Sequence, residues 1–266
     1  MSSVTLISTD LDGTLLNSMG EISARNVGAL REAARRGIGI IINTGRMFAS
    51  AKRFSAELGL DTSVICYNGA MIRGPRDETL SHMALDMDIA RRLLAIFRER
   101  NMYVQSYIDD VLLVKDQNED EARGYMRFYG VEGSPVGDEI YNPRTAPTKL
   151  LAVTSGTEES HGLMDELSRL FGPSLYVTRS NSEFVEMMNP AANKGRALAR
   201  LASEMRVPLE SVMALGDGEN DIEMLRLAGI GVAMKNAREA VRDAADVTAP
   251  SNNEDGVAWA VEKYAL

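Results

Sequence analysis

Histidine and cysteine are scarce in this chain, and their scarcity argues against several kinds of chemistry. The 266 residues include two histidines and one cysteine. Cys66 has no partner for an internal disulfide, which is consistent with a reducing compartment. His82 and His161 stand in neither an Arg-His-Gly motif nor a metal-ligand spacing, which disfavours a phosphohistidine mechanism. Gly-x-Ser-x-Gly and Gly-x-x-x-x-Gly-Lys-Ser/Thr motifs are missing, and no complete Gly-x-Gly-x-x-Gly follows a strand. Serine esterases, P-loop nucleotide hydrolases and dinucleotide-dependent enzymes therefore lose support.

Positive charge is also in short supply. The chain has 29 Lys and Arg against 38 Asp and Glu, a formal net charge of -9, which opposes nonspecific binding to nucleic acid. No apolar run is long enough to cross a bilayer, and Met1 to Thr9 lacks the basic region of a signal peptide. We therefore expect a soluble, cytoplasmic protein that binds neither nucleic acid nor membrane and exists as a monomer or small homo-oligomer.

Two closely spaced acids are the most informative feature that is present. The segment Asp10-Leu11-Asp12-Gly13-Thr14 directly follows the apolar run Val4 to Ser8. Because side chains i and i+2 leave an extended segment on the same side, Asp10 and Asp12 can face one small volume while Leu11 turns into the core. A divalent cation such as Mg²⁺ would relieve their mutual repulsion. Asp10 could then act as a nucleophile and Asp12 as an acid and base. The same residues also fit an ordinary polar turn.

The order of strand-like and helix-like segments predicts an α/β protein with parallel strands and crossover helices. Short apolar runs alternate with amphipathic stretches at both ends of the chain. Strands are expected at 4–8, 38–42, 63–67, 212–215 and 230–234, and helices from Ser23 to a stop at Gly37 and at 48–58, 194–205, 221–228 and 257–264.

Between these two parts the pattern changes to helices and paired strands. We expect residues 84–188 to form an α+β domain inserted into a domain made of 1–83 and 189–266. Within it, Asp86 is suited to cap a helix, and Gly130 to Pro147 is expected to be the least structured stretch. Two hairpin-like pairs of strands are expected, at 102–108 with 111–115 and at 175–179 with 183–187, and a helix at 158–171.

Chemically suggestive residues follow other predicted strands of the parallel sheet. Thr44 follows the strand 38–42, and Gly216 to Asp221 follows the strand 212–215. Ligands in such sheets bind beyond the carboxyl ends of the strands. Asp217 could complete a metal site with Asp10, although the loop also fits a helix cap with surface acids. Lys194 could offset charge between a carboxylate and a phosphate, although a lone lysine is usually a solvated surface residue.

Taken together, four segments resemble the four motifs of the haloacid dehalogenase superfamily. They are Asp10-x-Asp12-Gly13-Thr14, Thr44-Gly45-Arg46, Lys194-Gly195 and Gly216-Asp217-Gly218-x-Asn220-Asp221. The large insertion between the second and third motifs resembles the Cof-type phosphatases of that superfamily. The resemblance covers nearly the whole chain and implies a Rossmann-like, doubly wound parallel sheet with an inserted α+β cap domain.

The resemblance also implies roles for individual residues. Asp10 would attack phosphorus and become an aspartyl-phosphate, while Asp12 would protonate the leaving alkoxide and later activate water. Mg²⁺ would be bound by the Asp10 carboxylate, the Asp12 main-chain carbonyl and Asp217. Phosphate contacts would come from Leu11, Thr44, the Gly45 amide, Lys194 and Asn220. Asp221 would support these groups without touching the metal or the phosphate itself. Arg46 would either touch substrate or brace its loop. One departure from many relatives is Ala191-Ala192-Asn193 before Lys194, which leaves the backbone placement there less well defined.

These inferences predict a Mg²⁺-dependent phosphatase for small phosphorylated metabolites. Sugar phosphates are the first expectation, followed by phosphorylated cofactors such as flavin mononucleotide or pyridoxal phosphate, and the inserted domain is expected to act as a lid. A phosphomutase of related architecture is a second hypothesis, and a non-enzymatic phospholigand-binding module is a third. A receiver domain fits poorly because it needs neither the Asp12 acid nor a lid.

Overall fold

The chain folds into two compact units, one of which interrupts the other in sequence. The computed structural model describes residues 3–180 and 182–266. The first unit comprises Met1–Ser81 and Asn193–Leu266, and the second comprises His82–Ala192. Each unit has its own β-sheet, described separately below. Within the described residues, no helix combines the length and the apolar character that a membrane span requires.

The first unit contains an eight-stranded sheet whose central strands are all parallel. The pairings from β14 through to β3 are parallel, whereas β4 runs antiparallel to β3. The predicted parallel strands are present, and the structure adds β14, β4 and β5. Strands β14 and β4 have only three residues each, and β5 has the mostly polar sequence Thr-Leu-Ser-His, so none of them gives an apolar run. The order across the sheet is β14 (Val247–Ala249), β13 (Ile230–Met234), β12 (Val212–Gly216), β1 (Leu6–Thr9), β2 (Gly39–Asn43), β3 (Ser63–Cys66), β4 (Met71–Arg73) and β5 (Thr79–His82).

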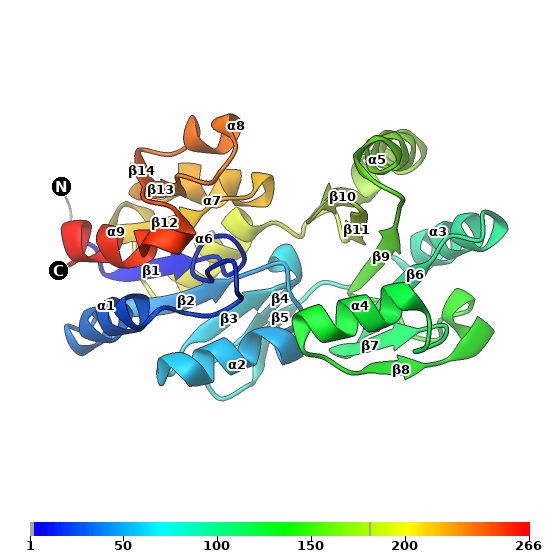
Figure 1. Cartoon of the computed structure of the whole chain (residues 1–266), viewed down its shortest axis with the longest axis horizontal. Coiled ribbons are helices and arrows are strands. Elements are labelled where there is room, and N and C mark those ends of the chain that lie inside the picture. Colours follow the sequence, from blue (N-terminus) through cyan, green and yellow to red (C-terminus); the bar gives the residue numbers. More distant parts are fainter. Residues whose placement is uncertain (1–2, 181) are drawn as a thin grey trace. The chain divides into compact units, whose positions relative to one another are not determined.

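Helices cover both faces of this sheet, as expected for a doubly wound fold (Figure 1). On one face, α6 (Lys194–Glu204), α7 (Ile222–Leu227) and α8 (Glu239–Arg242) bury apolar side chains together with Leu6 of β1 and Ile41 of β2. On the other face, α1 (Ala24–Arg35) contacts both α2 (Phe48–Leu58) and α9 (Gly256–Tyr264). Because neighbouring residues of a strand point to opposite faces, one apolar run supplies both layers of the core.

The second unit contains a six-stranded sheet that is antiparallel apart from the β7 and β8 pair. The two predicted hairpin-like pairs are present as β6 with β7 and β10 with β11. Between them lies β9, which the sequence pattern did not predict. Gly130 to Pro147 is more ordered than expected, since it contains β8 and a 3-10 turn at Gly137–Tyr141. The order is β10 (Tyr176–Arg179), β11 (Phe184–Met188), β9 (Lys149–Val153), β6 (Val104–Ile108), β7 (Val111–Val114) and β8 (Gly133–Pro135).

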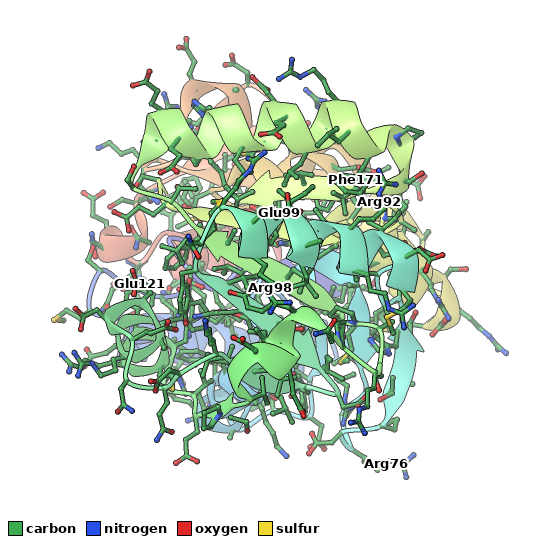
Figure 2. The ribbon with its side chains drawn as sticks, turned by 90° about the vertical axis from the view of Figure 1, so that its right-hand side faces the viewer. Arg76, Arg92, Arg98, Glu99, Glu121 and Phe171 are labelled. Atoms are coloured by element: carbon green, nitrogen blue, oxygen red, sulfur yellow. The ribbon has the colours of Figure 1, made fainter. Side chains whose placement is uncertain are left out.

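Both faces of this second sheet carry helices. On one face, α3 (Met87–Glu99) and α5 (Thr157–Phe171) share a buried apolar cluster with β6, β9 and β11. Figure 2 shows Arg92 of α3 beside Phe171 of α5, and the guanidinium carbon lies 4.7 Å from the ring centroid. The predicted cap of α3 is confirmed, because the Asp86 carboxylate accepts hydrogen bonds from two backbone amides of the first turn. On the other face, α4 (Asp120–Tyr129) contributes Tyr125, whose ring packs against Tyr107 of β6.

Candidate active site

The four motif segments converge within the first unit, at the carboxyl ends of three adjacent strands. Asp10 directly follows β1, Thr44 follows β2 and Asp217 follows β12. In the sheet these strands are neighbours in the order β12, β1, β2. Parallel strands end at the same edge, so residues that are distant in sequence are brought to one place.

Lys194, at the start of α6, is the cation at the centre of this cluster. Its Nζ lies 2.9 Å from Oδ1 of Asp10 and 2.6 Å from Oδ1 of Asp221, and its side chain is fully buried. Burial alone would lower the pKa of Lys194, but the two carboxylates raise it above its ordinary value. The ammonium therefore stays charged at neutral pH, and Lys194 is not a solvated surface residue.

Asp221 organises the acidic loop that follows β12. Its Oδ2 accepts hydrogen bonds from the backbone amides of Asp217, at 3.0 Å, and Gly218, at 2.9 Å. Its Oδ1 accepts a hydrogen bond from Lys194. Because both oxygens are already engaged, Asp221 fixes the shape of the loop and the place of the ammonium.

Asp217 is oriented by the first motif segment. The Thr14 hydroxyl donates a hydrogen bond of 2.6 Å to Oδ1 of Asp217. Gly13 has φ of +75°, and a Cβ at that position would overlap the Asp217 carboxylate. Burial, followed by the charge of Asp221, raises the pKa of Asp217 to about 7, although the Thr14 hydrogen bond opposes this. A glycine is therefore required here for space as well as for backbone conformation.

Three carboxylates gather around the single lysine. Asp10, Asp217 and Asp221 each offer an oxygen, and these oxygens all lie within 4.8 Å of one another. Burial raises the pKa of Asp10 well above its ordinary value; Lys194 lowers it, and the charges of Asp221 and Asp217 raise it further. One ammonium does not neutralise three carboxylates, of which two are buried and one is half-buried. Oxygen donors with excess negative charge fit a hard divalent cation such as Mg²⁺.

Asp12 lies outside this cluster of three, next to Arg46. The guanidinium of Arg46 donates hydrogen bonds to both Asp12 oxygens, at 2.7 Å from Nε and 2.5 Å from Nη2. The Arg46 side chain is 3% exposed, whereas the Asp12 side chain is 44% exposed. Asp12 remains near the cluster, because its charge contributes to raising the pKa of both Asp10 and Asp217.

Asn68, which was not among the predicted site residues, links the second motif segment to the fourth through hydrogen bonds. Asn68, in the turn after β3, donates from its backbone amide to the Thr44 carbonyl at 3.1 Å. Its side-chain oxygen accepts a hydrogen bond of 2.8 Å from Asn220. A Cβ at Gly45 would lie 2.9 Å from the same oxygen. Asn-Gly pairs are typical of turns, and Asn68 has a left-handed φ of +52°, but nothing in the sequence named its partners.

Asn43, the last residue of β2, is a second buried residue that the motif pattern did not single out. Its side-chain amide donates to the backbone carbonyl of Lys194 at 3.2 Å, which links β2 to the start of α6. Gly69 contacts the backbone of Asn193, the residue before Lys194, so closely that a Cβ at position 69 would overlap it. Leu11, which lies between the two acids of the first motif segment, is fully buried.

Comparison with known proteins agrees with this geometry. A family model of haloacid dehalogenase-like hydrolases matches residues 7–261. Phosphatase YwpJ of Bacillus subtilis is 30% identical, and the match covers 95% of this chain and 97% of that protein. The 5-amino-6-(5-phospho-D-ribitylamino)uracil phosphatase YitU of the same bacterium is 30% identical over 97% of each chain.

A solved structure of a known phosphatase has the same fold as this chain. The sugar phosphatase BT4131, described as a member of subclass IIB, superposes with a TM-score of 0.84 at 26% identity, covering 97% of this chain and 98% of that one. The match extends through both units, so it includes the inserted one. The chain therefore belongs to the haloacid dehalogenase-like hydrolases, in their Cof-type branch of phosphoric monoester hydrolases.

Proposed function

We propose that the protein is a Mg²⁺-dependent phosphatase that hydrolyses small phosphorylated metabolites through an aspartyl-phosphate on Asp10. The observation that carries the proposal is the buried Lys194 ammonium, which lies 2.9 Å from the Asp10 carboxylate and also forms an ion pair with Asp221. A buried cation beside a nucleophilic carboxylate lowers the electrostatic cost of bringing an anionic phosphate up to that carboxylate.

The proposed reaction has two steps. An Asp10 oxygen attacks phosphorus while the bond to the leaving oxygen breaks, and Asp12 gives that oxygen a proton. A water molecule then attacks the aspartyl-phosphate, Asp12 takes its proton, and inorganic phosphate leaves with Asp10 restored. The 44% exposure of the Asp12 side chain suits a group that exchanges protons with a leaving alcohol and with water.

The transferring phosphoryl group would be held by groups from all four motif segments. We assign it the Leu11 backbone, Thr44, the Gly45 amide, Lys194 and Asn220. Asn220 is supported in this role by its hydrogen bond to Asn68, which fixes the direction of its side chain. Asp10, Asp217 and the Asp12 main-chain carbonyl would hold Mg²⁺, which when bound offsets the negative charge of the phosphoryl oxygens.

The substrate class is proposed from the relatives. BT4131 is described as a sugar phosphatase, and YitU is named for a phosphate carried on a ribityl chain. Both names describe a phosphate ester of a polyhydroxylated carbon chain, so sugar phosphates are the first substrates to test. We further propose that the second unit acts as a lid that supplies specificity, and that the protein works in the cytoplasm, where its buried Cys66 stays reduced.

The test is phosphate release from a panel of phosphorylated sugars and cofactors, with Mg²⁺ or with a chelator. Asp10→Asn should lower kcat by about 10⁴-fold or more, because it removes the nucleophile. Asp61→Asn, at an exposed position of the same unit, is the control and should keep the wild-type rate. Wild-type turnover by Asp10→Asn defeats the assignment.

Two other results would redirect the function. Conversion of one phosphate ester into its positional isomer, without free phosphate, would indicate a phosphomutase. Binding of phosphorylated metabolites without turnover across the panel would indicate a phospholigand-binding module.

A further inference from the structure

Arg46 makes a two-pronged ion pair with Asp12, the group assigned above to proton transfer. Its Nε donates to one carboxylate oxygen and its Nη2 to the other, at 2.7 and 2.5 Å. A bidentate pair of this kind fixes both the position and the plane of a carboxylate. The restraint comes from the Arg46 side, because the Arg46 side chain is 3% exposed and the Asp12 side chain 44%.

Arg46 is itself held in place by the first turns of α2. Its Nη1 donates a hydrogen bond of 3.2 Å to the Ser50 hydroxyl, and its guanidinium carbon lies 5.1 Å from the centroid of the Phe54 ring. Its backbone amide donates to the Thr44 hydroxyl at 3.2 Å, and its carbonyl accepts from the Tyr67 amide at 3.0 Å. Arg46 is therefore anchored at both its backbone and its side chain.

These contacts decide between the two roles that the sequence left open for Arg46. Each of the three guanidinium nitrogens already donates a hydrogen bond, two to Asp12 and one to Ser50. The Arg46 side chain is also only 3% exposed, which leaves little of it to hold a substrate phosphate as well. The Arg46 side chain bonds to Asp12. A residue that only braced its loop would not need this contact.

We propose that Arg46 is a positioning residue for the proton-transfer group Asp12, and that it acts on the leaving-group step. This inference rests on the proposed phosphatase function. Loss of Arg46 should therefore slow esters whose leaving group must be protonated, and spare esters whose leaving group departs as a stable anion. A residue that contacts the phosphate would affect both kinds of ester equally, since both carry the same phosphate.

The experiment compares kcat/KM for two esters, a hexose 6-phosphate with an alcohol leaving group and p-nitrophenyl phosphate with a stable phenolate. Because kcat/KM covers the steps up to leaving-group departure, it isolates the first half of the reaction. Arg46→Met should lose about 10²-fold on the sugar ester and less than about 5-fold on the aryl ester. Inhibition by inorganic phosphate should be unchanged.

Three further single variants and one double variant complete the design. Arg53→Met is the matched control: Arg53 lies on α2, which begins two residues after Arg46, and its guanidinium carbon lies 4.5 Å from the centroid of the same Phe54 ring, but it is exposed, and both esters should keep their rates. Arg46→Lys keeps the charge without the two-pronged geometry and should show the same selective loss, even where Arg46→Met does not fold. Asp12→Asn should reproduce the pattern, and adding Arg46→Met to it should cause no further loss on the sugar ester.

Several results would overturn the inference. They are an equal loss on both esters, weaker inhibition by phosphate in either Arg46 variant, and a double variant whose losses add. A wild-type protein that releases phosphate from neither ester, nor from any member of the panel of phosphorylated sugars and cofactors, would reject the proposed function and this inference with it. An active wild-type enzyme with unselective losses rejects only the inference.

Discussion

The Lys194 ammonium lies 2.9 Å from the Asp10 carboxylate, although the whole second unit separates the two residues in sequence. Both side chains are buried, so water does not screen the pair. The same ammonium bonds Asp221, which makes it the shared counter-charge of two acids. The stability of the site and the proposed chemistry therefore both depend on this contact.

Lys194→Met should both inactivate and destabilise the protein. The substitution leaves Asp10 and Asp221 buried without their cation, and removing one partner of a buried ion pair costs about 3–5 kcal/mol. Thermal unfolding and turnover of a phosphate ester measure the two effects. Arg196→Met, on the same helix, is the control. Its ion pair with Glu223 is exposed, so its loss should cost at most about 1 kcal/mol and spare turnover. Equal effects of the two substitutions would contradict the prediction.

The metal-free protein should lose stability as the pH rises from about 4 to about 7. In the folded state the pKa of Asp217 is raised from its ordinary 3.8 to about 7, chiefly by burial. Between those values the folded state holds a proton that the unfolded chain has released, so the free energy of unfolding falls with rising pH. Asp217→Asn should lack this part of the pH dependence, which urea titrations of both proteins would measure.

Mg²⁺ should change that pH profile in a defined direction. Metal binding needs the ionised carboxylates, so the increase in melting temperature on adding Mg²⁺ should be larger at pH 7.5 than at pH 5.5. Asp217→Asn should reduce the increase at both values. A wild-type increase that is the same at both pH values would argue against Asp217 and Asp10 as the metal-binding groups.

Gly13→Ala should impair function more than its backbone strain explains. A side chain at Gly13 overlaps the Asp217 carboxylate, which must then leave its present position. Displacement of this kind can lower kcat by about 10²-fold. Gly20→Ala is a closely matched control, because Gly20 has φ of +76° and no atom within 4 Å of a new Cβ. Both variants should lose about 1–2 kcal/mol of stability from the left-handed backbone, but Gly13→Ala alone should lose turnover and Mg²⁺ affinity.

Lys149→Met should destabilise the second unit. Lys149 of β9 and Glu186 of β11 form an ion pair of 3.1 Å with side chains only 0% and 4% exposed. The substitution removes the Lys149 cation from a buried carboxylate, at a cost of about 3–5 kcal/mol. Lys115→Met removes an exposed ion pair with Asp138 and should cost at most about 1 kcal/mol. Limited proteolysis should therefore cut Lys149→Met within His82–Ala192 sooner than it cuts Lys115→Met.

The sequence predicted the parts of the fold that local patterns specify. Short apolar runs between helical segments gave the parallel strands, and Ser23 caps α1 as expected by accepting from the Asn26 amide. Strand β9 escaped prediction although it pairs with both β6 and β11, because it follows an irregular stretch without a neighbouring hairpin partner. Pairing of that kind depends on contacts between distant segments, which periodicity does not record.

The sequence by itself determined the α/β class, the order of the four motif segments and the identity of the chemically active residue types, because each depends on residues that are neighbours in the chain. Only the tertiary structure decided which groups meet. It gave Lys194 two carboxylate partners, joined Asn68 to Asn220 and directed Arg46 to Asp12. The physical reason is that parallel strands end at one edge of a sheet, and spacing along the chain does not encode which side chains share that edge.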